Sequence, residues 1–169
     1  MSFTPMGQTF VLNQKLVSIG GDLWIEDGNG NHAFEVDGKA FSLRRTLILR
    51  DTAGAELYEI NKSLAHLRTT FEIKRGDQVV ATIQRALVNL FGEHFTITAA
   101  NGEQLAVTGD WIAREFHIQS NGTDVILASR NFFSMHGSYG VRIAQGFDVP
   151  LGLAIVIALE QIELDEGRR

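Results

Sequence analysis

Val149-Pro-Leu-Gly-Leu-Ala-Ile-Val-Ile-Ala-Leu159 is the stretch that decides the fold of this chain, which has 169 residues. The run reaches Glu160 after eleven residues, whereas a membrane-spanning helix needs about 20. A helix over this run is apolar on every face, which is typical of a helix buried inside a protein. Asp148 stands where an N-cap is expected, and a proline is tolerated in a first turn. We therefore expect a buried helix over residues 149–164.

Composition limits what can surround this helix. Hydrophobic residues make up 44% of the chain, enough for one domain over residues 1–169. The absence of cysteine excludes disulfides, thiolate zinc sites and a catalytic thiol. A net charge of −5 argues against a nucleic-acid partner. The first residues lack the basic start and apolar core of a secretory signal. We expect a cytoplasmic protein without a membrane span.

A repeat of about 23 residues organises the rest of the chain. Gly- and Asn-rich turn signals separate short runs of alternating apolar residues, a pattern typical of antiparallel strands. When aligned, the runs start at residues 15, 39, 62, 85, 108 and 130. A unit of this length holds two strands of about seven residues with their connections, so six units predict about twelve strands.

Six such units suit few architectures. A propeller blade needs about 40–45 residues, so the chain would make fewer than four blades. An open sheet of about twelve strands would leave two raw edges, which a sandwich or a closed barrel hides. A barrel of this size is too wide for its own side chains to fill, but a helix about 10–12 Å across can fill it. We therefore predict a mostly β fold, a closed antiparallel barrel of about twelve strands at residues 8–146, around the buried C-terminal helix.

Several segments, taken in order, resemble one protein family. They are Trp24-Ile-Glu-Asp-Gly-Asn-Gly-Asn31, Phe34-Glu-Val-Asp-Gly-Lys-Ala-Phe-Ser-Leu43, Leu49-Arg-Asp-Thr-Ala-Gly-Ala-Glu-Leu57, Gly109-Asp-Trp-Ile-Ala-Arg-Glu-Phe-His-Ile118 and the closing helix from Leu151 to Ile162. Their order and spacing resemble the LURP-one-related (LOR) family of the tubby C-terminal-like superfamily, which also contains the phospholipid scramblases. The resemblance extends from about Gln8 to Leu164.

This resemblance implies a twelve-stranded barrel around a hydrophobic C-terminal helix. It also implies a connection with lipids, because tubby domains bind phosphoinositide head groups through basic side chains on the barrel and scramblases are tied to lipid movement. The chain departs from the scramblases: it has no cysteine cluster and no Pro-rich N-terminal extension, and only residues 163–169 follow its apolar helix. We therefore expect no scrambling activity, and no head-group residue of the tubby domains can be transferred to this chain.

Residue types that carry chemistry are not arranged for catalysis. The five histidines form no HExxH, HxH or HxxxH spacing. The adjacent carboxylates at 26–27 and 165–166 fall in an expected turn and in the tail. Ser134 and His136 have no Gly-x-Ser-x-Gly elbow around them. We expect no enzymatic activity, no metal and no cofactor.

One feature suggests a binding site. Basic residues occupy the same phase in five of the six repeats: Lys15, Lys39, Lys62, Arg85 and Arg130. If the repeats are geometrically equivalent, these cations ring one rim of the barrel and can bind an anion. The other interpretation is that they end strands and discourage edge pairing.

Three functions remain open at this point. The first is a non-catalytic binding module for an anionic phospholipid, a phosphorylated small molecule or a protein, which agrees with the resemblance and the basic phase. The second is a structural protein of a membrane-associated complex. The third is an enzyme whose residues converge only in three dimensions. The first predicts a protein peripheral to the inner membrane surface.

Overall fold

The computed structural model describes residues 6–13, 23–38, 46–63, 69–86, 93–132 and 138–167. These residues form twelve strands, a short 3-10 helix and one long helix: β1 (Met6–Asn13), β2 (Leu23–Asp27), β3 (His32–Asp37), β4 (Thr46–Asp51), β5 (Glu56–Ser63), β6 (Thr70–Arg75), β7 (Gln78–Arg85), β8 (Glu93–Ala99), β9 (Gln104–Asp110), β10 (Glu115–Ser120), β11 (Thr123–Ser129), η1 (Arg130–Phe132), β12 (Ser138–Ala144) and α2 (Val149–Gly167).

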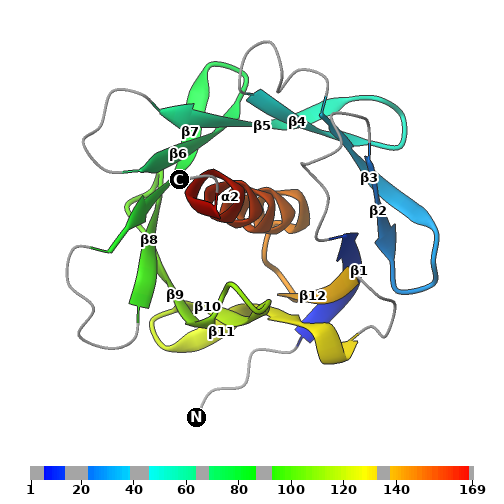
Figure 1. The fold of residues 1–169 in the computed structure, drawn as a ribbon. Coiled ribbons are helices and arrows are strands. Elements are labelled where there is room, and N and C mark those ends of the chain that lie inside the picture. Colours follow the sequence, from blue (N-terminus) through cyan, green and yellow to red (C-terminus); the bar gives the residue numbers. More distant parts are fainter. Residues whose placement is uncertain are drawn as a thin grey trace.

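The strands close into one barrel. Each strand pairs with its neighbours along the chain, and β1 pairs with β12 to complete the ring. Every pairing is antiparallel, and Figure 1 shows the ring of strands around the helix. The predicted closed antiparallel barrel of twelve strands around a C-terminal helix is confirmed.

Strand formation follows from the alternation of apolar residues. In β5, for example, Tyr58 and Ile60 are buried while their neighbours are partly exposed, and β10 buries Phe116 and Ile118 in the same way. A period of two places alternate side chains on opposite faces of a strand, so the apolar set faces the lumen. The inner faces of the strands and α2 together form one hydrophobic core.

The helix α2 fills the lumen, as its all-round apolar sequence predicts. Its residues from Gly152 to Ile162 are all buried, and Ile155 is 1% exposed. Asp148 caps its first turn, because the backbone N–H of Leu151 donates to Asp148 Oδ1 at 3.0 Å. No helix in the described ranges is long and apolar enough to cross a membrane.

The two ends of the barrel differ. At one end, which we call the turn end, the odd-numbered strands begin and tight turns link each even strand to the next element. Asp27 Oδ1 accepts the backbone N–H groups of Asn29 and Asn31 at 2.8 and 3.0 Å, and Asp51 closes the β4–β5 turn in the same way. At the other end, which we call the mouth, the odd-numbered strands end and the C-terminal part of α2 lies.

Candidate functional site

The structure places three of the five predicted basic residues. Lys62 is the penultimate residue of β5, Arg85 is the last residue of β7, and Arg130 follows β11 as the first residue of η1. All three therefore lie at the mouth, where odd-numbered strands end. Lys15 and Lys39 lie outside the described residues.

The strand register explains why residues at equivalent positions of the repeat lie at the same end of the barrel. Lys62 pairs with Phe71, and Phe71 pairs with Ile83, whereas Arg85 stands two residues beyond Ile83. A barrel requires such a stagger because its strands tilt relative to its axis. Paired residues, followed strand by strand from Ile83 across β8 and β9, reach Ser120, which lies at the turn end. Residues that stay at the mouth must therefore be offset from one hairpin to the next. The stagger of two residues keeps Lys62 and Arg85 at the mouth, where their backbones lie about 12 Å apart: two strand spacings across β6 combined with two residues along the strand.

Arg85 is held on an aromatic platform. Its position in the strand alternation follows that of the buried Ala81 and Ile83, so its side chain points to the inner side of the mouth. The guanidinium carbon lies 4.8 Å from the ring centre of Phe95 and 5.6 Å from that of Trp111. The two rings meet edge to face, with centroids 5.0 Å apart. Cation–π contacts of this kind fix the orientation of an arginine.

Arg130 does not join this group. Three strands separate β11 from β7 around the barrel, and the side chain of Arg130 is exposed. Its backbone N–H donates to Glu115 Oε1 at 2.9 Å, a bond that holds the start of η1. The structure thus brings Lys62 and Arg85 to neighbouring hairpins and places Arg130 elsewhere on the rim.

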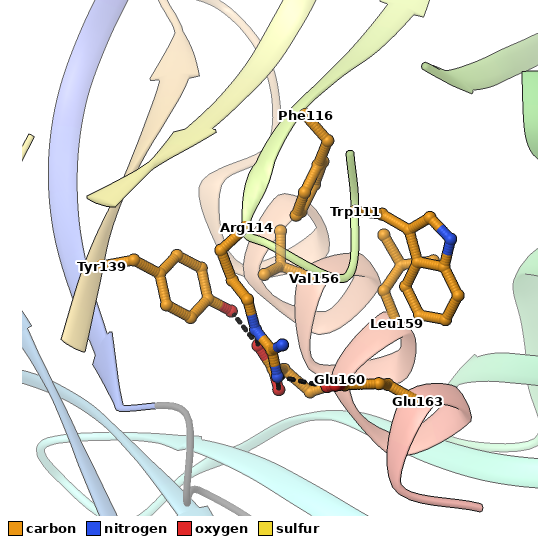
Figure 2. A pocket seen from close by; sticks show the side chains of 8 residues that line it. All are labelled: Trp111, Arg114, Phe116, Tyr139, Val156, Leu159, Glu160 and Glu163. Atoms are coloured by element: carbon orange, nitrogen blue, oxygen red, sulfur yellow. Dashed lines mark hydrogen bonds and ion pairs between the residues drawn. The ribbon is translucent and has the colours of Figure 1, made fainter. Parts of the chain in front are cut away.

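A second cluster at the mouth was not predicted from the sequence. Arg114, in the turn between β9 and β10, reaches the helix α2 and bonds two of its carboxylates (Figure 2). Its Nε and Nη2 atoms donate to the two oxygens of Glu160 at 2.9 and 2.6 Å, and Nη2 also donates to Glu163. The hydroxyl of Tyr139 donates to Glu160 Oε1 at 2.6 Å. The turn is therefore fastened to the helix by a two-pronged ion pair.

Burial and charge shape the electrostatics of this cluster. Burial by itself lowers the pKa of Arg114, but the hydrogen bonds to Glu160 and Glu163 outweigh it, so the net shift is upward and the guanidinium stays charged. Burial, followed by the negative charge of Glu160, raises the pKa of Tyr139 well above its usual value. The hydroxyl therefore remains a hydrogen-bond donor at neutral pH.

Arg114 adopts a backbone conformation that few side chains favour. Its φ is 61°, in the left-handed region, which costs about 1–2 kcal/mol for a residue with a Cβ atom. A change of backbone that withdrew the guanidinium would leave the buried charge of Glu160 unpaired, and an unpaired buried charge typically destabilises by about 3–5 kcal/mol. The strain is therefore maintained by the contact of Arg114 with the helix.

The sequence carries one signal for this cluster. Glu160 and Glu163 follow the apolar run with the spacing of neighbours on one helix face, and a carboxylate on a buried helix needs a partner. The identity of that partner could not be derived, because Arg114 is 46 residues away from Glu160 in the chain. Only the closed barrel brings them together.

The hollow around Arg114 is filled. It is lined by Trp111, Arg114, Tyr139 and the two glutamates, and it has no room for a water molecule (Figure 2). A larger hollow of about 410 Å³ lies at the turn end, between β1, β12 and the start of α2. A ligand could therefore enter the hollow around Arg114 only if the Arg114 cluster rearranged.

The histidines that the structure describes on β8 and β10 contact groups of the neighbouring strands. Among the described residues, no group of three or more His, Asp or Glu side chains is placed to hold a metal ion. His94 contacts the carbonyl oxygen of Gly109 at 2.8 Å, and His117 contacts Asp124 at 3.1 Å, both in exposed surroundings. These contacts tie neighbouring strands together on the outer face.

Comparisons with known proteins agree with this architecture. The protein is similar to the uncharacterized protein YxjI of Bacillus subtilis (strain 168), with 28% identity over 151 residues, which cover 89% of this chain and 91% of that protein. Its fold matches an X-ray structure of a protein from Arabidopsis thaliana with a TM-score of 0.70 at 17% identity, covering 95% of this chain and 93% of the other. The family model described as LURP-one-related matches residues 8–160. The chain therefore belongs to the LURP-one-related family.

Proposed function

We propose that this protein is a non-catalytic binding module that takes a phosphate-bearing anion at the mouth of its barrel. The observation that carries the proposal is the pair Lys62 and Arg85, which the register brings to neighbouring hairpins at one end of the barrel. Two basic side chains whose backbones lie about 12 Å apart suit a phosphate-bearing group that lies between them better than a clamp on one carboxylate. The aromatic platform under Arg85 orients its guanidinium in advance of binding.

The turn end is a poor place for an anion. Its turns and adjoining strand ends carry Asp27, Asp51, Glu56, Asp77, Glu103, Asp124 and Asp148. Arg50 and Arg75, the arginines nearest to these turns, are paired there with Glu56 and Asp148 at 3.3 Å each. These carboxylates repel an approaching anion from the turn end.

The source of the anion sets the biological role. A phospholipid head group would hold the protein at the inner surface of the cytoplasmic membrane, whereas a free phosphorylated molecule would not. The net charge of −5 opposes long-range attraction to either, so we expect modest affinity that falls as salt screens the rim. Both sources share one chemistry, a phosphate group between Lys62 and Arg85.

A binding assay with a charge-matched control tests the proposal. Wild-type protein is mixed with phosphatidylcholine vesicles with and without phosphatidylglycerol, and separately with pyrophosphate, at low salt and at about 0.15 M salt. We expect binding to the anionic vesicles or to pyrophosphate at low salt. The variant Lys62→Gln/Arg85→Gln should bind about thirtyfold more weakly, since each of the two basic side chains near an anionic surface contributes about 1 kcal/mol.

The control variant, Lys74→Gln/Arg75→Gln, removes the same charge next to the turn end and should bind like the wild type. Circular dichroism shows whether each variant remains folded. Equal losses in the two variants would mean that net charge alone drives binding, and an absence of binding by the wild type at low salt would overturn the proposal. Vesicle binding without pyrophosphate binding would identify a lipid surface as the ligand.

A further inference from the structure

Glu163 occupies a position at the mouth that an incoming anion could use. Its carboxylate accepts a hydrogen bond from Arg114 Nη2 and lies on the outer side of the cluster. The side chain of Glu163 is 28% exposed, whereas those of Glu160 and Arg114 are 4% and 8% exposed. Glu163 is therefore the one carboxylate of the cluster that solvent and solutes reach.

The two glutamates bind Arg114 differently. Glu160 takes both Nε and Nη2 with its two oxygens and also accepts the hydroxyl of Tyr139. Glu163 contacts only Nη2, which it shares with Glu160. Loss of the Glu163 contact would leave Arg114 charged, paired and in place, so an outside anion could replace Glu163 without exposing a buried charge.

Arg114 is linked to the proposed anion site through Trp111. The indole lines the same hollow as Arg114 and forms part of the platform under Arg85, whose guanidinium carbon is 5.6 Å from the indole ring. One tryptophan therefore borders both the Arg114 cluster and Arg85. With Glu160 and Glu163 both bound, the Arg114 cluster carries a net charge of −1, which repels an anion near Arg85.

We propose that Glu163 is an intramolecular competitor for the anion site, occupying on Arg114 the place that a phosphate oxygen of the ligand takes. This inference rests on the proposed function and deepens it, because it adds Arg114 to the site and assigns an autoinhibitory contact to α2. Binding then exchanges one anionic partner of Arg114 for another, and the helix carboxylate turns outward to solvent.

Affinity measurements on Glu163→Gln test this inference. Pyrophosphate and anionic vesicles of the stated composition are titrated into wild type and variant at low salt. The glutamine side chain lacks the negative charge of Glu163 and so competes poorly with an anion for the guanidinium of Arg114. We therefore expect the variant to bind roughly three- to fivefold more tightly than the wild type. Glu56→Gln is the matched control, because Glu56 also accepts from an arginine, Arg50, but belongs to the turn end; it should change affinity by less than about 1.5-fold.

Each outcome separates the two proposals. Wild-type binding with no gain in Glu163→Gln would overturn the competition and leave the proposed function intact, whereas binding by neither protein would overturn both. If Glu163→Gln and Glu56→Gln both bound more tightly, the change in net charge alone would explain the gain, and this result would also overturn the competition. If Glu163→Gln does not fold, Glu163→Asp shortens the side chain by one methylene while keeping its charge, and it should give a smaller gain of the same sign.

Discussion

At the scale of single residues, Gly140 shows how closely the barrel wall is packed. It lies in β12 beneath the 3-10 helix η1, and a Cβ atom at this position would fall 2.4 Å from Cβ of Phe132. The ring of Phe132 in turn lies 3.9 Å from the guanidinium carbon of Arg142. Glycine is required here for space, so that η1 can lie flat on the strand.

Substitution of Gly140 by Ala should therefore destabilise the protein by about 1–3 kcal/mol, the usual cost of overpacking a filled site. Urea denaturation measures the change in the free energy of unfolding. In a Phe132→Gly background the opposing Cβ is gone, and the same substitution should cost less than half as much. An unchanged midpoint for Gly140→Ala in the wild-type background would show that η1 does not rest on β12 as described.

At the scale of elements, α2 is fastened at both ends by the same combination of a tyrosine, an arginine and a carboxylate. At its start, the hydroxyl of Tyr58 donates to Asp148 Oδ2 at 2.7 Å and Arg75 lies 3.3 Å from the same oxygen. Near its end, Glu160 takes Tyr139 and Arg114 in the same roles. Tyr58 and Tyr139 are the only tyrosines of the chain, so both serve the helix.

These tyrosines predict a loss of stability in alkali. Burial, reinforced by Asp148, raises the pKa of Tyr58 to about 12, and the pKa of Tyr139 is raised well above 10. A tyrosine whose folded pKa exceeds its unfolded value stabilises the fold below pH 10. That contribution is lost as the pH rises through the folded pKa, by at most about 1.4 kcal/mol per pH unit for each group.

Urea denaturation between pH 8 and pH 11 measures this slope, with Tyr58→Phe as the comparison. The variant lacks one of the two titrating hydroxyls, so its free energy of unfolding should fall less steeply above about pH 10. Lysines titrate in the same range in both proteins and cancel in the comparison. Identical slopes for the two proteins would contradict the assigned shift of Tyr58.

Much of the fold at this scale could be predicted from the sequence. The 23-residue period and the eleven apolar residues after Asp148 are local patterns, and together they predict a barrel with a helix inside it. The contacts of Arg114 could not be predicted, because they depend on which strand faces which part of α2 after closure. The register of the strands could not be predicted either. The repeat shows that Lys62 and Arg85 occupy equivalent positions in their units, but it does not show by how many residues their strands are offset.

At the scale of the whole molecule, the barrel separates two chemical environments. The turn end is closed by short turns whose carboxylates bond their own backbone, as Asp27 and Asp51 do; the backbone hydrogen bonds of Asn31 and Asn29 lower the pKa of Asp27. The mouth combines the cations Lys62, Arg85 and Arg114 with the carboxylates of Glu160 and Glu163 and with the aromatic platform of Phe95 and Trp111. The closed sheet leaves no strand edge in the described ring, so recognition by strand addition is disfavoured there.

Binding of anions at the mouth can be followed through the two tryptophans of the chain. Trp111 belongs to the mouth, whereas Trp24 lies on the outer face, 40% exposed and stacked on His32. In a proton–nitrogen correlation spectrum each indole N–H gives one signal, and a Trp24→Phe variant assigns them. Titration with pyrophosphate at low salt should shift the Trp111 signal progressively to saturation and leave the Trp24 signal in place. A Trp111 signal that stays fixed at saturating pyrophosphate, or that moves no more than the Trp24 signal, would contradict binding at the mouth.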